Sequence, residues 1–417
     1  MLPLTTDLVT EISEWKPRRG AFVGVRLEVT WFAAASFLCG VTTPIVIGIV
    51  GELYVGELLL IQLAFLMLLL NGTKSLPESR VFIFFLQLAV VMLIGYLLAD
   101  IYRDARPAQF LRGWARIILL SLDIAALTII AANDKRNLWW FALGMALGGL
   151  CDLAFREIPM YTTSGWKLGY GMSFAVLMGC GSCVLPIRIA ALGFALLGVG
   201  NILMDYRILG AICIILAALI WLRSSCVNRL SGMLVWQLVL ACLVAGGLII
   251  GALTATQDDY AVRRQESNVG RGAALSVAAM AIAESPLIGY GSWPMDARLV
   301  NLYYNKVDEQ MGKLERPRVR TNVFLAHSQI LQGWVEGGVL GVLFWFFYGY
   351  WLIRAGCYVA VRRPFDAFVP VFLFFLVYDL WHLMMSPFGG ASRFMIAIGV
   401  AIICVCAGEN RTTRASL

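Results

Sequence analysis

Residues 315–341 combine a cationic cluster with one of only two histidines in the chain. Three arginines precede His327, and an apolar run long enough to cross a bilayer follows it. These arginines are Arg316, Arg318 and Arg320. A guanidinium group grips two phosphate oxygens at once, and an imidazole exchanges protons near neutral pH. Nearby positive charge would lower the pKa of the histidine and keep it neutral, as a base must be. The stretch therefore predicts a phosphate-binding site with His327 as catalytic base, with helix capping as the alternative role.

Two further arginines are predicted to face the same membrane interface. Arg207 lies in Met-Asp-Tyr-Arg, where an apolar stretch begins, and Arg271 begins a run of helix-forming residues. Arginines from separate elements at one interface suit a diphosphate at headgroup depth. The alternative for each arginine is an orienting or snorkelling charge.

Other candidate groups favour structural roles. Asp379 and His382 are spaced to share one helical face, which predicts a structural pair, with a proton relay as the alternative. Cys180 and Cys183 have redox-motif spacing but lie in an apolar run, which favours buried hydrophobic side chains. Two histidines and a long polar loop without cysteine give little to hold a metal, so we expect no metal and no cofactor.

The composition is that of an all-α polytopic membrane protein. The chain is 60% hydrophobic and 14% charged, with a mean hydropathy of +0.79. No cleaved signal peptide is expected in the first 30 residues. The net charge of +7 is expected from orienting loops, so no nucleic acid partner is predicted. Twelve apolar stretches are candidate spans: 31–50, 53–70, 81–100, 117–132, 138–154, 169–185, 189–204, 208–222, 232–252, 333–353, 365–385 and 394–407. The sixth and seventh are predicted to be a helix pair around Pro186, with one broken helix as the alternative.

The distribution of basic residues predicts the orientation. Segments assigned to the inner side hold sixteen Lys and Arg, the short outer connections eight and the long loop nine. This bias predicts cytoplasmic termini and, in a bacterium, a periplasmic loop, in the bacterial inner membrane. The predicted regions are a cytoplasmic arm at 1–30, spans one to nine within 31–252, the periplasmic loop at 253–326, spans ten to twelve within 327–407, and a cytoplasmic tail at 408–417.

One outer connection, 101–116, runs against this bias. It holds four arginines: Arg103, Arg106, Arg112 and Arg116. They indicate an orientation error, an interfacial helix with snorkelling side chains, or an outer rim that collects anions.

The long loop is predicted to be structured. Residues 271–284 are strong helix formers, and the proline and glycines of 285–291 then end the helix. Eight acidic residues nearly balance the nine basic ones, so the loop is not a polybasic tail. Nine predicted spans precede the loop and three follow it. This division argues against a transporter built from two halves of six spans each.

Several of these motifs resemble those of the O-antigen ligase/polymerase family. Ala326-His327-Ser-Gln-Ile-Leu-Gln332 followed by Glu336-Gly-Gly-Val-Leu-Gly341 resembles the family's His-Asn-x-x-Leu…Glu-x-Gly-x-x-Gly signature. Glu284-Ser-Pro-Leu-Ile-Gly-Tyr-Gly291 resembles its Asn/His-Pro-Leu-x-Gly-x-Gly segment, with Arg271 matching an arginine upstream. Tyr206-Arg207 resembles its Ser-Arg-Gly, with Tyr and Ile in place of Ser and Gly, and Ser328 replaces the usual asparagine. The resemblance covers about 200–345.

The resemblance implies a metal-independent, inverting glycosyltransferase of the GT-C class. The donor would be a glycan on undecaprenyl diphosphate, with Arg207 and Arg271 holding the diphosphate and His327 activating the acceptor hydroxyl. The acceptor would be another glycan, in an O-antigen or exopolysaccharide polymerase, or lipid A–core of lipopolysaccharide, in a ligase. A chain-length regulator is a possible partner, beside membrane lipid.

The altered motifs favour a polymerase slightly, and the ligase stays open. A carrier or flippase for a lipid-linked anionic glycan would use the same arginines without making a bond. A structural subunit of a polysaccharide assembly complex is the third alternative.

Overall fold

A computed structural model describes residues 29–48, 51–77, 79–225, 258–311, 323–361 and 367–415. The described chain is helical apart from a short antiparallel hairpin, in which Val46 of β1 pairs with Tyr54 of β2. The elements are α2 (Trp31–Val41), β1 (Val46–Gly48), β2 (Glu52–Tyr54), α3 (Val55–Asn71), η1 (Gly72–Ser75), α4 (Arg80–Tyr102), α5 (Pro107–Asn133), α6 (Lys135–Phe155), α7 (Thr163–Gly165), η2 (Trp166–Tyr170), α8 (Gly171–Gly181), α9 (Ile187–Leu203), α10 (Arg207–Ser225), α12 (Asp258–Glu284), α13 (Ala297–Met311), α14 (Gln329–Val361), α15 (Val369–Met385) and α16 (Ser392–Ala415).

Four of the described helices are long and apolar enough to cross a membrane, namely α4, α5, α6 and the α14 segment to Ala360. Seven shorter apolar segments accompany them: α2, α3, α8, α9, α15, the α10 segment to Leu222 and the α16 segment to Gly408. Each of these eleven helices overlaps one of the twelve predicted stretches, and the remaining stretch, 232–252, lies outside the described residues. The chain is therefore an all-α membrane protein in its described part, while the count of twelve spans and the region boundaries stay predictions.

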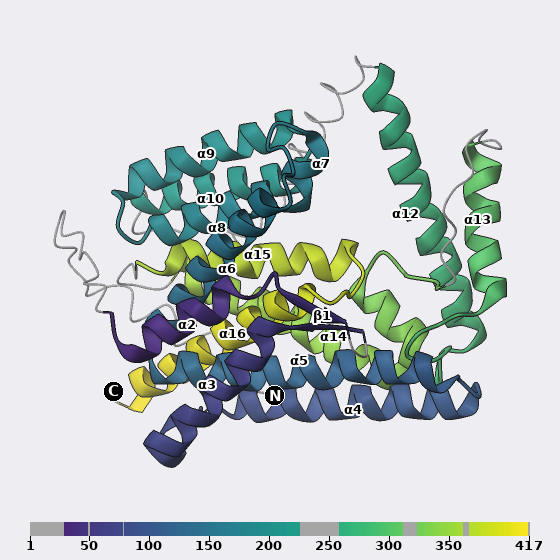
Figure 1. Cartoon of the computed structure of the whole chain (residues 1–417), viewed down its shortest axis with the longest axis horizontal. Coiled ribbons are helices and arrows are strands. Elements are labelled where there is room, and N and C mark those ends of the chain that lie inside the picture. The colour runs from purple at the N-terminus through teal and green to yellow at the C-terminus, as the bar shows by residue number, and fades with distance from the viewer. Residues whose placement is uncertain are drawn as a thin grey trace.

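The helices form two groups beside a central layer (Figure 1). Helices α4 and α5 run side by side, and α14 and α16 pack on them. Helices α8, α9 and α10 gather at one side of this layer, and α12 and α13 rise together from its opposite end (Figure 1). The end of the layer from which α12 and α13 rise is also where α14 begins, so the long loop stands beside the predicted site.

Glycine lets α2 and α6 approach closely. A Cβ atom on Gly40 would lie 2.2 Å from the Phe141 carbonyl oxygen, and one on Gly144 would lie 2.1 Å from the Phe37 carbonyl oxygen. Small residues of this kind bring membrane helices together, because lipid offers little hydrophobic drive for their association.

The first predicted span was too long. Helix α2 ends at Val41, and the chain turns through Thr42, Thr43 and Pro44 into β1. Both threonine hydroxyls donate to carbonyls of the preceding helical turn, and proline cannot continue the helix. The predicted pair around Pro186 is confirmed, because α8 ends at Gly181 and α9 begins at Ile187.

The long loop is folded in its described part, as its sequence predicted. Helix α12 contains the predicted helix 271–284 and begins earlier, at Asp258. A second helix, α13, was missed by the sequence analysis. The two helices share a small apolar core with residues near the start of α14, and that core includes Ala281, Leu299, Phe324 and Val335. This core fixes the loop against α14.

Candidate active site

A turn of the long loop is inserted into a break in α14. Gly338 has φ 61° and ψ −150°, which interrupts the helix. In an unbroken helix the amide of Val339 would donate to the carbonyl of Val335. Here the Val339 amide donates to the Leu287 carbonyl at 3.3 Å, and the Val335 carbonyl accepts from the Tyr290 amide at 2.7 Å. The two segments that resemble family motifs therefore meet and satisfy each other's backbone groups.

Replacing Gly338 with alanine is expected to destabilise the protein by about 1–3 kcal/mol from backbone strain alone. The new Cβ would also lie 2.1 Å from the Leu287 carbonyl oxygen, so the inserted turn would have to move. The measurement is thermal unfolding of the purified protein in detergent.

Gly408→Ala in α16 is the matched control for this substitution, because nothing lies within 4 Å of a Cβ at that position. It should be neutral or slightly stabilising, since alanine favours a helix over glycine by about 1 kcal/mol. Equal melting temperatures for the two variants would contradict the inserted-turn account.

A buried ion pair stands beside the break. Glu336 accepts from Arg116 Nη2 at 2.5 Å, from the Tyr96 hydroxyl at 2.6 Å and from Gln332 Nε2 at 2.8 Å. Arg116 also donates to the carbonyls of Ser292 and Phe388, at 3.2 and 3.0 Å. The network joins α4, α5 and α14 to two connecting segments, and so fixes the start of α14.

This network corrects the interpretation of 101–116 as an outer rim. Helix α5 begins at Pro107, so Arg112 and Arg116 belong to a helix, and Arg116 is buried against Glu336. Arg103 donates to the Gly289 carbonyl at 3.1 Å and lies over the Tyr290 ring. Arg103 and Arg116 therefore hold the inserted turn, and the buried Arg116 is not part of a rim for anions. Snorkelling does not describe Arg116 either.

His327 lies two residues before the start of α14 at Gln329, the helix whose start this network fixes. Ser328 follows it, accepts from the Leu331 amide at 3.4 Å and donates to the Leu383 carbonyl at 3.1 Å. Serine therefore caps α14 where the family usually has asparagine, and ties this point to α15. Among the described residues, the half-buried imidazole of His327 has no hydrogen-bond partner of standard geometry at Nδ1. The capping role is filled by the neighbouring serine.

Arg271 of α12 lies close to His327. Burial lowers the pKa of His327 below its ordinary value of 6.5, the backbone of Leu325 opposes this, and the positive charge of Arg271 lowers it further. An imidazole in this setting is neutral at physiological pH and able to accept a proton. The Arg271 side chain is exposed, so it can meet a ligand from solution or from the membrane surface.

Arg207 is held at the turn between α9 and α10. It donates to Asp205 Oδ1 at 3.0 Å, and Lys167 donates to the other oxygen, Asp205 Oδ2, at 2.7 Å. The Asp205 carboxylate therefore pairs with two cations, one at each oxygen. Arg207 and His327 are linked indirectly, through a cavity. Tyr206, next to Arg207, and Gln329, two residues after His327, both line this cavity.

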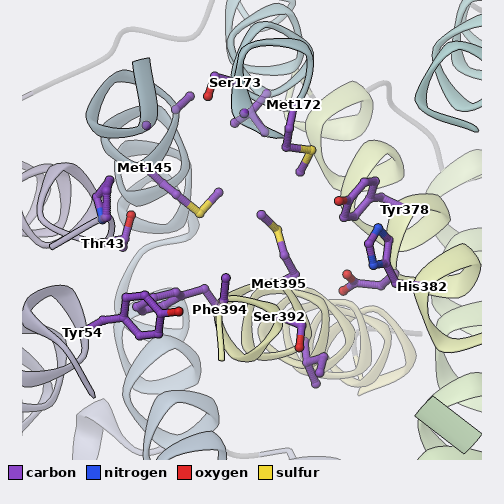
Figure 2. Close-up of a pocket in the computed structure, with 18 of the residues that line it drawn as sticks. Thr43, Tyr54, Met145, Met172, Ser173, Tyr378, His382, Ser392, Phe394 and Met395 are labelled. Atoms are coloured by element: carbon purple, nitrogen blue, oxygen red, sulfur yellow. The ribbon is translucent and has the colours of Figure 1, made fainter. Parts of the chain in front are cut away.

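That cavity has a volume of about 360 Å³ (Figure 2). Helices α6, α8, α15 and α16, the start of α14 and the hairpin region contribute to its wall, and Lys167 lies on it. Tyr378 and His382 lie side by side on one wall, with Met172 and Met395 near them and Tyr54 across the cavity (Figure 2). An aromatic and thioether wall with a few polar groups is typical of a small-molecule site.

The remaining predicted residues divide into two groups. Arg316, Arg318 and Arg320 lie outside the described residues, so their phosphate-binding role stays a prediction. Asp379 accepts from the Tyr348 hydroxyl at 2.6 Å, and the His382 ring lies against the Tyr378 ring with centroids 4.1 Å apart and planes tilted by 34°. Both line the cavity.

Three polar residues at the site were missed by the sequence analysis: Lys167, Asp205 and Gln329. Asp205 stands directly before Tyr206-Arg207, and its φ of 56° marks a tight turn, but a single sequence gives no sign of this. Gln329 lies in the quoted segment after His327 and could have been weighed there. Lys167 had no local signal, because its partner Asp205 is distant in the chain.

A comparison with known families covers the region of the site. No curated protein matches the chain. A family model described as O-Antigen ligase matches residues 187–346, a region that contains Arg207, Arg271, His327 and Glu336. Members of that family are glycosyltransferase-like enzymes. Residues 187–346 are therefore similar to the O-antigen ligase family.

Proposed function

We propose that the chain is a periplasm-facing glycosyltransferase that moves a glycan from undecaprenyl diphosphate onto an acceptor glycan, as an O-antigen or exopolysaccharide polymerase. The observation that carries this proposal is that α12 packs against Ala326 and that the charge of Arg271 acts on His327, both within the matched region. A neutral base beside a fixed positive charge suits a reaction in which a hydroxyl loses its proton while an anion departs.

The proposed reaction is a single displacement at the anomeric carbon of the donor sugar. The acceptor hydroxyl oxygen forms a bond to that carbon, and the bond from the carbon to the diphosphate oxygen breaks. The hydroxyl proton passes to His327, and the lipid diphosphate leaves with the bonding electron pair. Attack from the face opposite the leaving group inverts the configuration at that carbon.

The arginines take the role that a metal ion has in many reactions of diphosphates. Arg271 and Arg207 bind the diphosphate oxygens and offset the charge that grows as the lipid diphosphate departs. Arg316, Arg318 and Arg320 extend this cationic surface in the proposal. The Lys167–Asp205–Arg207 cluster supports it, because Asp205 pairs with both cations and Lys167 lines the cavity. A metal is not needed for this charge balance.

Product analysis of a strain that lacks the chain tests the function. A lost polymerase leaves single repeat units on the surface lipid. A lost ligase leaves full-length chains on undecaprenyl diphosphate. That second result would identify the chain as a ligase that transfers the glycan to lipid A–core, instead of a polymerase. Purified protein with lipid-linked donor and acceptor decides between an enzyme and a carrier. A new glycosidic bond supports the transferase, and transport with no glycan product would reject it.

A further inference from the structure

Two buried side chains in the cavity wall have polar atoms without a hydrogen-bond partner among the described residues. Gln329 is 1% exposed, and neither its amide nitrogen nor its amide oxygen has a partner in the described part of the chain. Asp379 is 2% exposed; its Oδ2 accepts from Tyr348, while its Oδ1 has no partner among the same residues. Both residues line the cavity that Figure 2 shows. Buried polar groups are nearly always paired, so these atoms indicate a ligand that pairs with them.

The unpartnered atoms fit a hydroxyl-rich ligand. An amide offers both a donor and an acceptor, and a carboxylate oxygen needs a donor. Adjacent hydroxyls of a sugar ring supply both kinds of group. The rings of Tyr378 and His382, tilted by 34° to each other, line the same cavity (Figure 2) and add an aromatic surface that suits the C–H face of such a ring. We infer that this part of the cavity is a subsite for an uncharged sugar ring of the glycan, with Gln329 as its recognition residue.

Other occupants fit less well. An isoprenoid chain would contact the methionines but leave the Gln329 amide and Asp379 Oδ1 unpaired, which is costly in a buried site. An anionic group would face the Asp379 carboxylate, while Lys167, the cation on the cavity wall, is paired with Asp205. The volume of about 360 Å³ is within the range of small-molecule sites.

The inference rests on the proposed function, because the sugar ring would belong to the transferred or accepting glycan. Gln329 is two residues from His327. A ring held by Gln329 would therefore lie next to the reacting unit, and its hydroxyl pattern would help select the glycan. This makes Gln329 a specificity residue rather than a catalytic residue.

The test is a binding titration with Gln329→Leu in the full-length protein in lipid nanodiscs. The first probe is the oligosaccharide released by mild acid from the host's own lipid-linked pool, and the second is farnesyl diphosphate. Losing the amide bonds should weaken oligosaccharide binding about tenfold or more and leave farnesyl diphosphate binding unchanged. Gln87→Leu is the matched control, because it replaces glutamine by leucine at an exposed position of α4.

Unchanged oligosaccharide affinity in Gln329→Leu would overturn the inference, and so would selective loss of farnesyl diphosphate binding. If that variant does not fold, Met395→Trp fills the cavity from α16 and should also weaken oligosaccharide binding. The outcomes separate this inference from the proposed function. Gln329-dependent binding without any transfer would keep the subsite and reject the transferase. Active transfer with Gln329-independent binding would reject the subsite alone.

Discussion

Replacing Arg116 with methionine is expected to destabilise the protein by about 3–5 kcal/mol, because it leaves the buried Glu336 carboxylate without its counter-charge. The carbonyls of Ser292 and Phe388 would lose their donor at the same time. The inserted turn should then loosen from α14. Denaturant unfolding of the purified protein measures the change in unfolding free energy.

Two further variants make this prediction specific. Arg156→Met breaks an ion pair with Asp152 in which the arginine is 59% exposed, so it should cost at most about 1 kcal/mol. The double variant Arg116→Met/Glu336→Gln removes both charges and should recover part of the loss. Equal effects of Arg116→Met and Arg156→Met would contradict a structural role for the buried pair.

Replacing His327 with alanine is expected to lower the rate of glycan transfer by roughly 10²–10⁴-fold, the usual contribution of a general base. Affinity for the lipid-linked donor should stay the same, because in the proposed mechanism the arginines bind the diphosphate. Single-turnover transfer with purified protein, together with donor titration, measures the two quantities separately.

Leu325→Ala is the control for this loss, because it changes an exposed side chain of the same segment without removing an ionisable group. It should keep the transfer rate. A His327→Ala variant with normal transfer would exclude this residue as the base. A variant with equally reduced donor binding would show that the histidine acts in binding rather than in proton transfer.

Much of the helical framework could be predicted from the sequence, because long apolar runs in a membrane protein have little alternative to a helix. The first predicted span failed where Pro44 and two threonines end α2. Helix α13 was missed because it is polar on average and its apolar face packs on α12 rather than on lipid. Such a helix is stabilised by tertiary contacts that no single stretch reveals.

The site was predictable in its residue types and much less in its connections. Both glycine-bearing segments could be recognised in the sequence. The insertion of the loop turn into α14 could not, because it depends on a glycine-only conformation at Gly338. The role of Arg116 was left open among three alternatives, because counting charges by position cannot reveal a buried partner 220 residues away. Gln329 gained meaning only when the structure left its amide buried and unpaired.

The pH dependence of transfer by the wild type and by Arg271→Gln tests the central claim most directly. The base works only when neutral, so the rate should fall as the pH drops through the pKa of His327, which lies below 6.5 in the wild type. Removing the charge of Arg271 raises that pKa, so the acid limb should move to higher pH. Arg271→Lys keeps the charge and should keep the position of the limb. An acid limb at the same pH in the wild type and in Arg271→Gln would contradict an arginine and a histidine that act together at this site.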